Sequence, residues 1–258
     1  VLVLAGDHIY KMDYGPMIAA HVEKGADITV GVVEVPRPTA REFGVLSVTE
    51  WNRVTQFTEK PAEPDTIPGR GDTSLASMGI YVFNAALLEQ LLVADAHDAT
   101  SAHDFGRNII PGAIDKLQVF AYPFTDVKTR AQSYWRDVGT VDAYYEANIE
   151  LVYVAPELNL YDEEWPIWTY QAHLPPAKFV LDEDGRRGMA VNSMIAGGCI
   201  ISGAIIDQSL LYSNVRVDER SQVHRSVVLP NVKIGRGCTI RNAILDEGCE
   251  IPDGTQIG

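Results

Sequence analysis

The residues best suited to chemistry in this sequence are acidic side chains that follow or precede regular segments. Asp7 comes directly after an apolar run, and Asp137 lies shortly before a helix-like segment. A carboxylate at the end of a strand can hold Mg²⁺, which takes one or two protein ligands and neutralises phosphate oxygens. The alternatives are a turn-capping role for Asp7, and an ion pair with Arg136 or Lys128 for Asp137.

A lysine and a glutamate next to a proline form a second candidate group. Pro61 disfavours helical geometry at the preceding residue, so we expect Lys60 to be extended at the end of its strand. A fixed ammonium there can bind a phosphate, while Glu59 can accept hydrogen bonds from sugar hydroxyls. The alternative is an exposed Glu–Lys pair on the surface, which the spacing alone favours.

Other polar groups carry weaker signals. Ser77 stands two residues before Gly79, where a ligand can approach the backbone closely, and residues 101–106 form a polar cluster at a helix start, for which capping is the default explanation. No GxSxG motif, reactive cysteine signature or lysine in an apolar run occurs, so covalent catalysis is not indicated. The histidines lack metal-ligand spacing, and we assign no ligand role to His8, His21, His97, His103, His173 or His224.

The segments that must position these residues alternate between strand-like and helix-like patterns. We expect strands at residues 1–5, 28–35, 44–49, 53–58, 77–83 and 117–122, with 44–58 forming a hairpin. We expect helices after Asp13 as far as Gly25, and at residues 85–93, 105–114 and 141–152, the last one amphipathic and capped by Thr140. This alternation predicts an α/β domain, with the first strand buried in a mainly parallel sheet.

The last part of the chain has a different period. Periodicity fades at 155–191, which predicts a linker; beyond it, valine and isoleucine pairs six residues apart recur every 17 residues at Val217 and Val223, Ile234 and Ile240, and Ile251 and Ile257. Glycines 235, 237, 248 and 254 suit the corners. A β-sandwich has no reason to keep this register, so residues 192–258 predict a left-handed parallel β-helix, here incomplete.

Composition excludes several classes of protein. The 258 residues include 21 basic and 35 acidic ones, a net charge of −14, and are 46% hydrophobic. We therefore expect a folded protein that binds neither nucleic acid nor an anionic membrane. Cys199, Cys238 and Cys249 have no CxxC spacing, which indicates reduced core cysteines and a cytoplasmic location.

An ordered series of motifs along the whole sequence resembles the bacterial glucose-1-phosphate adenylyltransferase (ADP-glucose pyrophosphorylase) family. The motifs are AGDHIYKMDY, FGV, FTEKP, SMGIYVF, SAHDFG, YWRDVGT, LYDEEWPIWTY and LPPAKF. The resemblance implies a partial Rossmann-like (GT-A-like) nucleotidyltransferase domain with a mixed sheet at 1–154, followed by the linker and the β-helix. It also implies the synthesis of ADP-glucose and pyrophosphate from ATP and glucose 1-phosphate, for glycogen-type biosynthesis.

Roles for individual residues follow from the same resemblance. Asp7 and Asp137 are expected to hold Mg²⁺, and Lys60 to bind the sugar phosphate. The glucose would be surrounded by Gly44, Glu59, Ser77, Tyr81, Asp104, Phe105 and Trp135. The reaction needs alignment and charge neutralisation more than acid–base work. The family also implies a homotetramer and sugar-phosphate effectors, with Arg186 and Arg187 as effector candidates or simply solvated charges.

One part of the family pattern is absent from this sequence. The glycine-rich GxGxR-type loop belongs before Val1, so we expect the chain as given to bind ATP weakly. The sequence closes at Gly258 inside a repeat, and we therefore expect missing sequence on both sides. Alternatives are a regulatory subunit without turnover, a sister enzyme that uses UTP, dTTP or GTP, and a hexapeptide acyltransferase for which only His224 is available.

Overall fold

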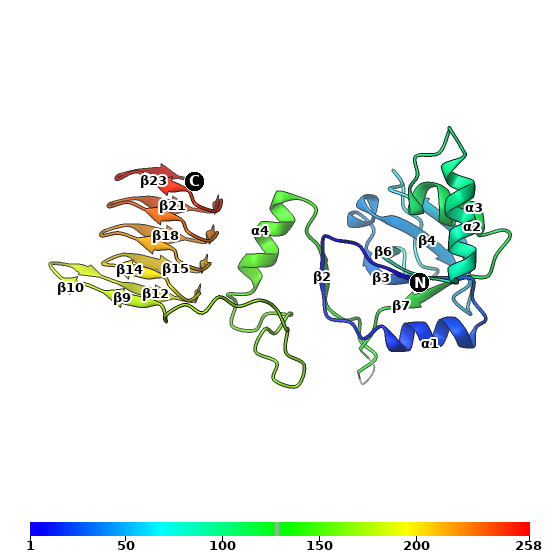
Figure 1. Ribbon diagram of the computed structural model, residues 1–258, viewed down its shortest axis with the longest axis horizontal. Helices are drawn as coiled ribbons and strands as arrows, with labels where there is room; N and C mark the ends of the chain where they lie inside the picture. The colour runs from blue at the N-terminus through cyan, green and yellow to red at the C-terminus, as the bar shows by residue number, and fades with distance from the viewer. Residues whose placement is uncertain (127–128) are drawn as a thin grey trace. The chain divides into compact units, whose positions relative to one another are not determined.

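The computed structural model describes residues 1–126 and 129–258, so Lys128, a predicted partner of Asp137, lies outside the described residues. The chain folds as two compact units, Val1–Trp135 and Arg136–Gly258 (Figure 1). Helix α4 (Val141–Glu150) belongs to the second unit, whereas the sequence predicted a boundary after residue 154. No helix in the described part of the chain is long and apolar enough to span a membrane.

A mixed sheet forms the centre of the first unit, in the strand order β5-β4-β6-β3-β7 with β1 paired to β6. The strands are β1 (Leu2–Val3), β3 (Ile28–Pro36), β4 (Gly44–Val48), β5 (Val54–Glu59), β6 (Thr73–Phe83) and β7 (Val119–Pro123). Only β3 and β7 run parallel among these pairs. The prediction of a mainly parallel sheet was therefore wrong, although each predicted strand exists.

The first strand is less buried than its apolar sequence suggested. Val1 and Leu4 are 57% and 45% exposed. Among the described strands β1 pairs with β6 alone, at Leu2↔Val82 and Val3↔Tyr81, so its other edge has no strand beside it. An apolar strand at a sheet edge keeps part of its surface open because burial requires neighbours on both sides.

Helices cover both faces of the sheet, which gives the predicted α/β layering. On one face Leu88 of α2 (Ala85–Ala96) and Ile110 of α3 (Ile110–Ala113) share a core cluster with Ile28 and Val30. On the other face Met17 of α1 (Gly15–Glu23) packs with a second cluster. Helix η2 (Phe105–Ile109), a π-helix turn, runs directly into α3. The short elements β2 (His8–Tyr10), η1 (Thr39–Glu42) and β8 (Trp135–Asp137) complete the connections.

Turn chemistry agrees with the predicted ends of several elements. Gly25 has φ 56°, as expected where it stops helix α1, and the β4–β5 hairpin turns through Asn52 at φ 61°. Asp13 does not cap α1 as predicted: its Oδ1 accepts from Gly15 N at 2.8 Å, while Tyr14 occupies the N-cap position without a side-chain cap bond. Asp13 thus forms a tight turn just before the helix.

The second unit begins with α4, which packs on a parallel β-helix. Thr140 Oγ1 accepts from Ala143 N at 3.1 Å, the cap that the sequence predicted. Tyr145 donates from its hydroxyl to Arg225 O at 2.5 Å, and Tyr212 of the solenoid donates from its hydroxyl to Oδ1 of the buried Asn148. Although the helix is amphipathic as predicted, Val141 is 73% exposed, because it lies at the first position of the helix, before the turns that reach the solenoid.

Three stacks of short parallel strands build the β-helix (Figure 1). One stack contains β12 (Met189–Val191), β15 (Ile205–Asp207), β18 (Gln222–His224), β21 (Thr239–Arg241) and β24 (Gln256–Ile257); the next contains β13 (Met194–Ile195), β16 (Leu210–Leu211), β19 (Val227–Val228) and β22 (Ile244–Leu245); the third contains β9 (Lys178–Val180), β14 (Ile200–Ser202), β17 (Arg216–Val217), β20 (Lys233–Ile234) and β23 (Glu250–Ile251). A small hairpin of β10 (Asp182–Glu183) and β11 (Arg186–Arg187) projects from the first coil.

The predicted period sets the register of the β-helix. Val217 pairs with Ile234, Val223 pairs with Ile240, and the next coil continues each column at Ile251 and Ile257. The coils begin earlier than predicted, since β9 lies inside the segment 155–191 that we expected to be a linker. Cys199 and Cys238 are buried in this core and Cys249 is partly buried, all as free thiols.

At one corner of each coil lies a residue whose backbone is in the left-handed conformation. Gly203, Arg220, Gly237 and Gly254 have φ of 58°, 63°, 63° and 74°, and they follow one another at the 17-residue period. Gly237 and Gly254 were predicted at corners. Glycine suits this conformation because it has no Cβ, so Arg220 holds it at a cost that its glycine counterparts avoid.

Candidate functional site

A polar cluster gathers in the first unit where β5, β6 and η2 meet. Gly44 pairs with Glu59 across the β4–β5 hairpin, and a Cβ built on Gly106 would lie 2.5 Å from Glu59 Oε2. Ser77 and Tyr81 project from β6, with their hydroxyl oxygens 3.5 Å apart. Glycine is required beside Glu59 because a side chain on η2 at this point would displace the carboxylate.

Asp104 fixes the start of η2 and also adds charge to this cluster. Its Oδ1 accepts from Gly106 N at 2.8 Å and from Arg107 N at 2.9 Å, which confirms the predicted capping role. Phe105 follows it, with its ring 5.7 Å from the ring of Tyr81. The sequence placed Asp104 and Phe105 together with Tyr81, and the structure brings these three residues into one neighbourhood.

The electrostatics of the cluster centre on Glu59. Burial raises the pKa of Glu59, and the charge of Asp104 raises it further, while Lys60 and Arg107 act in the opposite direction. Burial also raises the pKa of Tyr81, with smaller contributions from the two acids. Two carboxyl groups and two hydroxyls close together provide the acceptors and donors that a polyhydroxylated ligand needs.

Lys60 lies beside the cluster but not in the conformation that we predicted. Its φ is 47°, a left-handed value, and its backbone N donates to Phe43 O at 3.0 Å. Pro61 disfavours the right-handed helical region for the residue before it, and Lys60 takes the left-handed region instead of the extended one that we expected. The ammonium is exposed and forms no ion pair with any described residue.

Asp7 follows β1 and carries an exposed carboxylate. Its side chain is 62% exposed, and its Oδ1 lies 3.6 Å from Nε2 of His8, whose side chain is only 10% exposed. The His8 ring packs edge-on against Trp135, with the centroids 4.9 Å apart. Nδ1 of His8 and Nε1 of Trp135 are buried without a hydrogen-bond partner among the described residues.

Sequence reasoning missed the contribution of His8. The search for metal-ligand spacing gave it no role, yet its ring fills the space between Asp7 and Trp135. A Cβ built on Gly79, at φ 66°, would lie 3.3 Å from Cε1 of His8, so the glycine leaves room for this ring. The one available signal was the adjacency of His8 to Asp7.

Asp137 ends β8 and belongs to the second unit. It lies three residues before Thr140, the cap of α4, and its Oδ1 accepts from Gly139 N at 2.8 Å. Arg136 pairs with Glu150 at 2.7 Å. Asp7 and Asp137 lie in different units, so their joint metal site stays a prediction.

Charged candidates in the β-helix are already paired. Arg186 lies 2.8 Å from Glu219, and Arg187 lies 2.9 Å from Asp182. His224 Nδ1 lies 2.9 Å from Asp207 Oδ2, one coil away. These contacts join neighbouring strands and turns, so they account for the residues structurally without a ligand.

A separate pocket of about 450 Å³ lies in the first unit and contains none of the predicted site residues. Leu46, Leu75 and Phe124 contribute apolar surface to it. Two of its charged residues, Arg70 and Glu34, form an ion pair with each other. Its chemistry therefore differs from that of the Glu59 cluster.

Comparison with known proteins extends these observations. A family model described as nucleotidyl transferase matches residues 1–152, and one described as GlmU-like, C-terminal hexapeptide, matches residues 175–258. The second match agrees with the left-handed parallel β-helix that the sequence predicted, and it begins close to β9.

Individual relatives share sequence along the whole chain. Proteins named glucose-1-phosphate adenylyltransferase are 61% identical in Nitrosococcus oceani and 58% identical in Methylococcus capsulatus, and one named glucose-1-phosphate adenylyltransferase 2 is 59% identical in Alkalilimnicola ehrlichii. Each match covers 100% of this chain and 61% of the relative. The chain thus spans about three fifths of the length of these relatives. Since the first family model covers more than half of the sequence, the chain belongs to the nucleotidyl transferase family.

Proposed function

We propose that this chain is the greater part of a glucose-1-phosphate adenylyltransferase. In the proposed reaction a phosphate oxygen of glucose 1-phosphate attacks the α-phosphorus of ATP. The bond from this phosphorus to the oxygen bridging the β-phosphorus breaks, and pyrophosphate leaves. The high identity to relatives of that name supports the proposal, and the Glu59 cluster is the structural observation that carries it.

The cluster has the composition that a sugar phosphate requires. Glu59 and Asp104 offer carboxylate oxygens to sugar hydroxyls, and Ser77 and Tyr81 can either donate or accept. Lys60 lies next to this group with a free ammonium, which suits the phosphate. The other residues assigned to the sugar are Gly44, Phe105 and Trp135, whose glycine backbone and aromatic rings give the site its shape.

Mg²⁺ is the proposed metal, with Asp7 and Asp137 as its protein ligands. The exposed Asp7 carboxylate fits this role, because Mg²⁺ prefers carboxylate oxygens and keeps several of its waters. The bound ion would neutralise charge on the phosphate oxygens of the nucleotide. His8 packs between Asp7 and Trp135 and restricts where the carboxylate can lie.

The first test is a pyrophosphate-release assay. It uses a chain of the relatives' full length that contains this sequence, called the long form below. The long form is incubated with glucose 1-phosphate, Mg²⁺ and ATP, UTP, dTTP or GTP in turn. We expect ATP-selective release that falls by at least about a hundredfold in Asp7→Ala, which is roughly 2.7 kcal/mol of transition-state stabilisation. The matched control is Asp13→Ala, which removes a turn hydrogen bond to Gly15 N and no proposed metal ligand.

The other outcomes discriminate between the alternatives. Release with UTP, dTTP or GTP would identify a sister enzyme, and no release with any nucleotide would favour a regulatory subunit.

Our proposal also includes a cytoplasmic homotetramer that responds to sugar-phosphate effectors. Light scattering of the long form and a titration of the assay with phosphorylated sugars test those two parts.

A further inference from the structure

An aspartate near the end of helix α2 binds the loop that leads into η2. Asp95 Oδ1 accepts a hydrogen bond from Ser101 Oγ at 2.5 Å, and its Oδ2 lies 2.8 Å from Nδ1 of His103. Ser101 Oγ in turn accepts from the backbone N of His103 at 3.0 Å. The side chain of Asp95 is only 14% exposed, although it lies on a surface helix.

This trio of serine, histidine and aspartate does not have the geometry of a nucleophilic triad. A serine nucleophile needs a base at its hydroxyl, with the acid behind that base. Here the hydroxyl of Ser101 donates to Asp95, and the ring of His103 faces the same carboxylate. Both partners converge on Asp95, which is the arrangement of a structural clamp.

The clamp holds a strained residue next to the site. His103 has φ 56°, a left-handed conformation that residues other than glycine adopt rarely. The next residue is Asp104, whose carboxylate caps η2 through Gly106 N and Arg107 N. Gly106 in turn lies against Glu59. A continuous path of hydrogen bonds and close contacts therefore runs from Asp95 to the acids of the proposed sugar site.

We propose that Asp95 is a positioning residue for glucose 1-phosphate, acting through His103 and Asp104. It touches no substrate itself; it keeps the left-handed turn at His103, so that Asp104 and Phe105 face the sugar. Hydrogen bonds from Ser101 and His103 hold the pKa of Asp95 below its usual range, so the carboxylate is charged at neutral pH. This inference rests on the proposed function.

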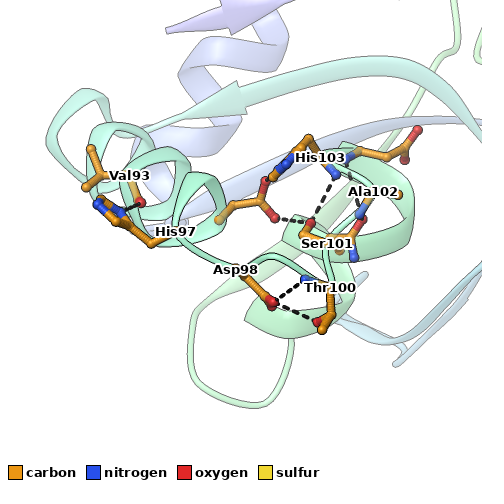
Figure 2. Close-up of polar contacts among 10 residues, drawn as sticks. Val93, His97, Asp98, Thr100, Ser101, Ala102 and His103 are labelled. Atoms are coloured by element: carbon orange, nitrogen blue, oxygen red, sulfur yellow. Dashed lines mark hydrogen bonds and ion pairs between the residues drawn. The ribbon is translucent and has the colours of Figure 1, made fainter.

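The same loop offers a matched control. Asp98 Oδ1 accepts from Thr100 N at 2.9 Å and from Thr100 Oγ1 at 2.7 Å, so it also forms a local aspartate turn (Figure 2). Neither the Asp98 nor the Thr100 side chain forms a hydrogen bond with Asp104 among the described residues. Asp98→Ala thus removes a similar pair of bonds without breaking the path.

The experiment measures steady-state kinetics and amide hydrogen exchange on the long form. We expect Asp95→Ala to raise KM for glucose 1-phosphate about tenfold, equivalent to about 1.4 kcal/mol, with kcat and KM for ATP within about twofold. Asp98→Ala should leave all three near the wild-type values. Exchange of the Gly106 and Arg107 amides should accelerate in Asp95→Ala only.

Two substitutions at His103 separate positioning from general loss of stability. His103→Asn should stay within about twofold of wild type in KM, because asparagine tolerates left-handed geometry and can still bind Asp95. His103→Val should resemble Asp95→Ala, because a β-branched residue strongly disfavours that geometry. Thermal unfolding of each variant, recorded by circular dichroism, shows which ones are folded.

The possible outcomes decide the inference and the proposed function separately. Equal KM and equal exchange in Asp95→Ala and Asp98→Ala would overturn the positioning role. If wild type releases no pyrophosphate from glucose 1-phosphate and ATP, the proposed function fails. Faster exchange at Gly106 in Asp95→Ala would then still support the path from Asp95 to Asp104.

Discussion

Gly44 and Gly106 both lie against Glu59, and replacing each of them with alanine should have a different effect. The change at Gly44 should lower stability, and the change at Gly106 should weaken ligand binding. A Cβ on Gly44 would overlap the ring of Phe57, at 2.7 Å from Cε1, and it would lie 2.9 Å from Glu59 Oε2. A Cβ on Gly106 would meet chiefly the end of the Glu59 side chain. Phe57 is only 6% exposed and belongs to the core, so its ring cannot move aside, whereas the carboxylate of Glu59 can rotate.

The expected magnitudes follow from this difference. Gly44→Ala should lower the free energy of unfolding by about 1–3 kcal/mol, the usual cost of an extra methyl group in a packed core. Gly106→Ala should change it by less than about 1 kcal/mol, because the gain of roughly 0.5–1 kcal/mol from replacing a helical glycine offsets the displaced carboxylate. Gly106→Ala should nevertheless weaken glucose 1-phosphate binding, since Glu59 is pushed out of position.

Urea unfolding of both variants and calorimetric titration of the long form with glucose 1-phosphate measure the two effects. The contrast is the decisive result: a stability loss with Gly44→Ala and an affinity loss with Gly106→Ala at wild-type stability. If Gly106→Ala binds the sugar phosphate as well as wild type, Glu59 does not contact it. If Gly44→Ala is as stable as wild type, the packing of Phe57 against the hairpin is looser than described.

Three further predictions concern stability and pH. Ile240→Ala in the solenoid core should lower the free energy of unfolding by about 2–5 kcal/mol, measured with urea. Ile205→Ala, at a position that is 43% exposed, should lower it much less, and equal losses would contradict the assigned core. Arg220→Gly should raise the free energy of unfolding by about 0.5–1 kcal/mol, because glycine adopts the left-handed conformation without strain. Arg241→Gly, within β21, should lower it. A lower free energy of unfolding in both variants would argue against strain at the corner. The raised pKa of Glu59 means that its contribution to stability is fully present below the ordinary glutamate value and is lost as pH rises through the raised pKa. Wild type should therefore lose stability relative to Glu59→Gln over that interval in a pH series of unfolding curves, and parallel curves would show that burial of the carboxyl group has no such effect.

The β-helix was the part of the fold that sequence alone predicted best, because each coil repeats the same requirement. Val217 and Ile234 occupy equivalent positions in successive coils, so the period is visible without any knowledge of distant contacts. The start of the solenoid was harder to place. The first coil packs on one side only, and β9 carries Lys178 and Phe179 rather than a repeated valine or isoleucine.

For the candidate site, the sequence named residues whose roles stay predictions, and it could not give their geometry. Capping by Asp104 follows from local sequence, and the structure confirms it. Lys60, which is left-handed, binds Phe43, 17 residues away, through its backbone N, and the role of Asp95 depends on where helix α2 ends. Contacts of this kind arise from tertiary structure, so neighbouring residues along the chain give no signal for them.

The spacing of strand pairs also has a kinetic consequence. In the β-helix most paired strands lie 16 or 17 residues apart, as at Val223↔Ile240, and the first coil, at Lys178↔Ile200, spans 22, so each coil closes a loop of modest length. In the first unit Asp27 and Gln118, which are 91 residues apart, must meet before β3 and β7 can pair. Because folding slows as the mean separation of contacts grows, the solenoid should form by rapid addition of coils, and closure of the β3–β7 pair should limit the folding rate of the sheet unit.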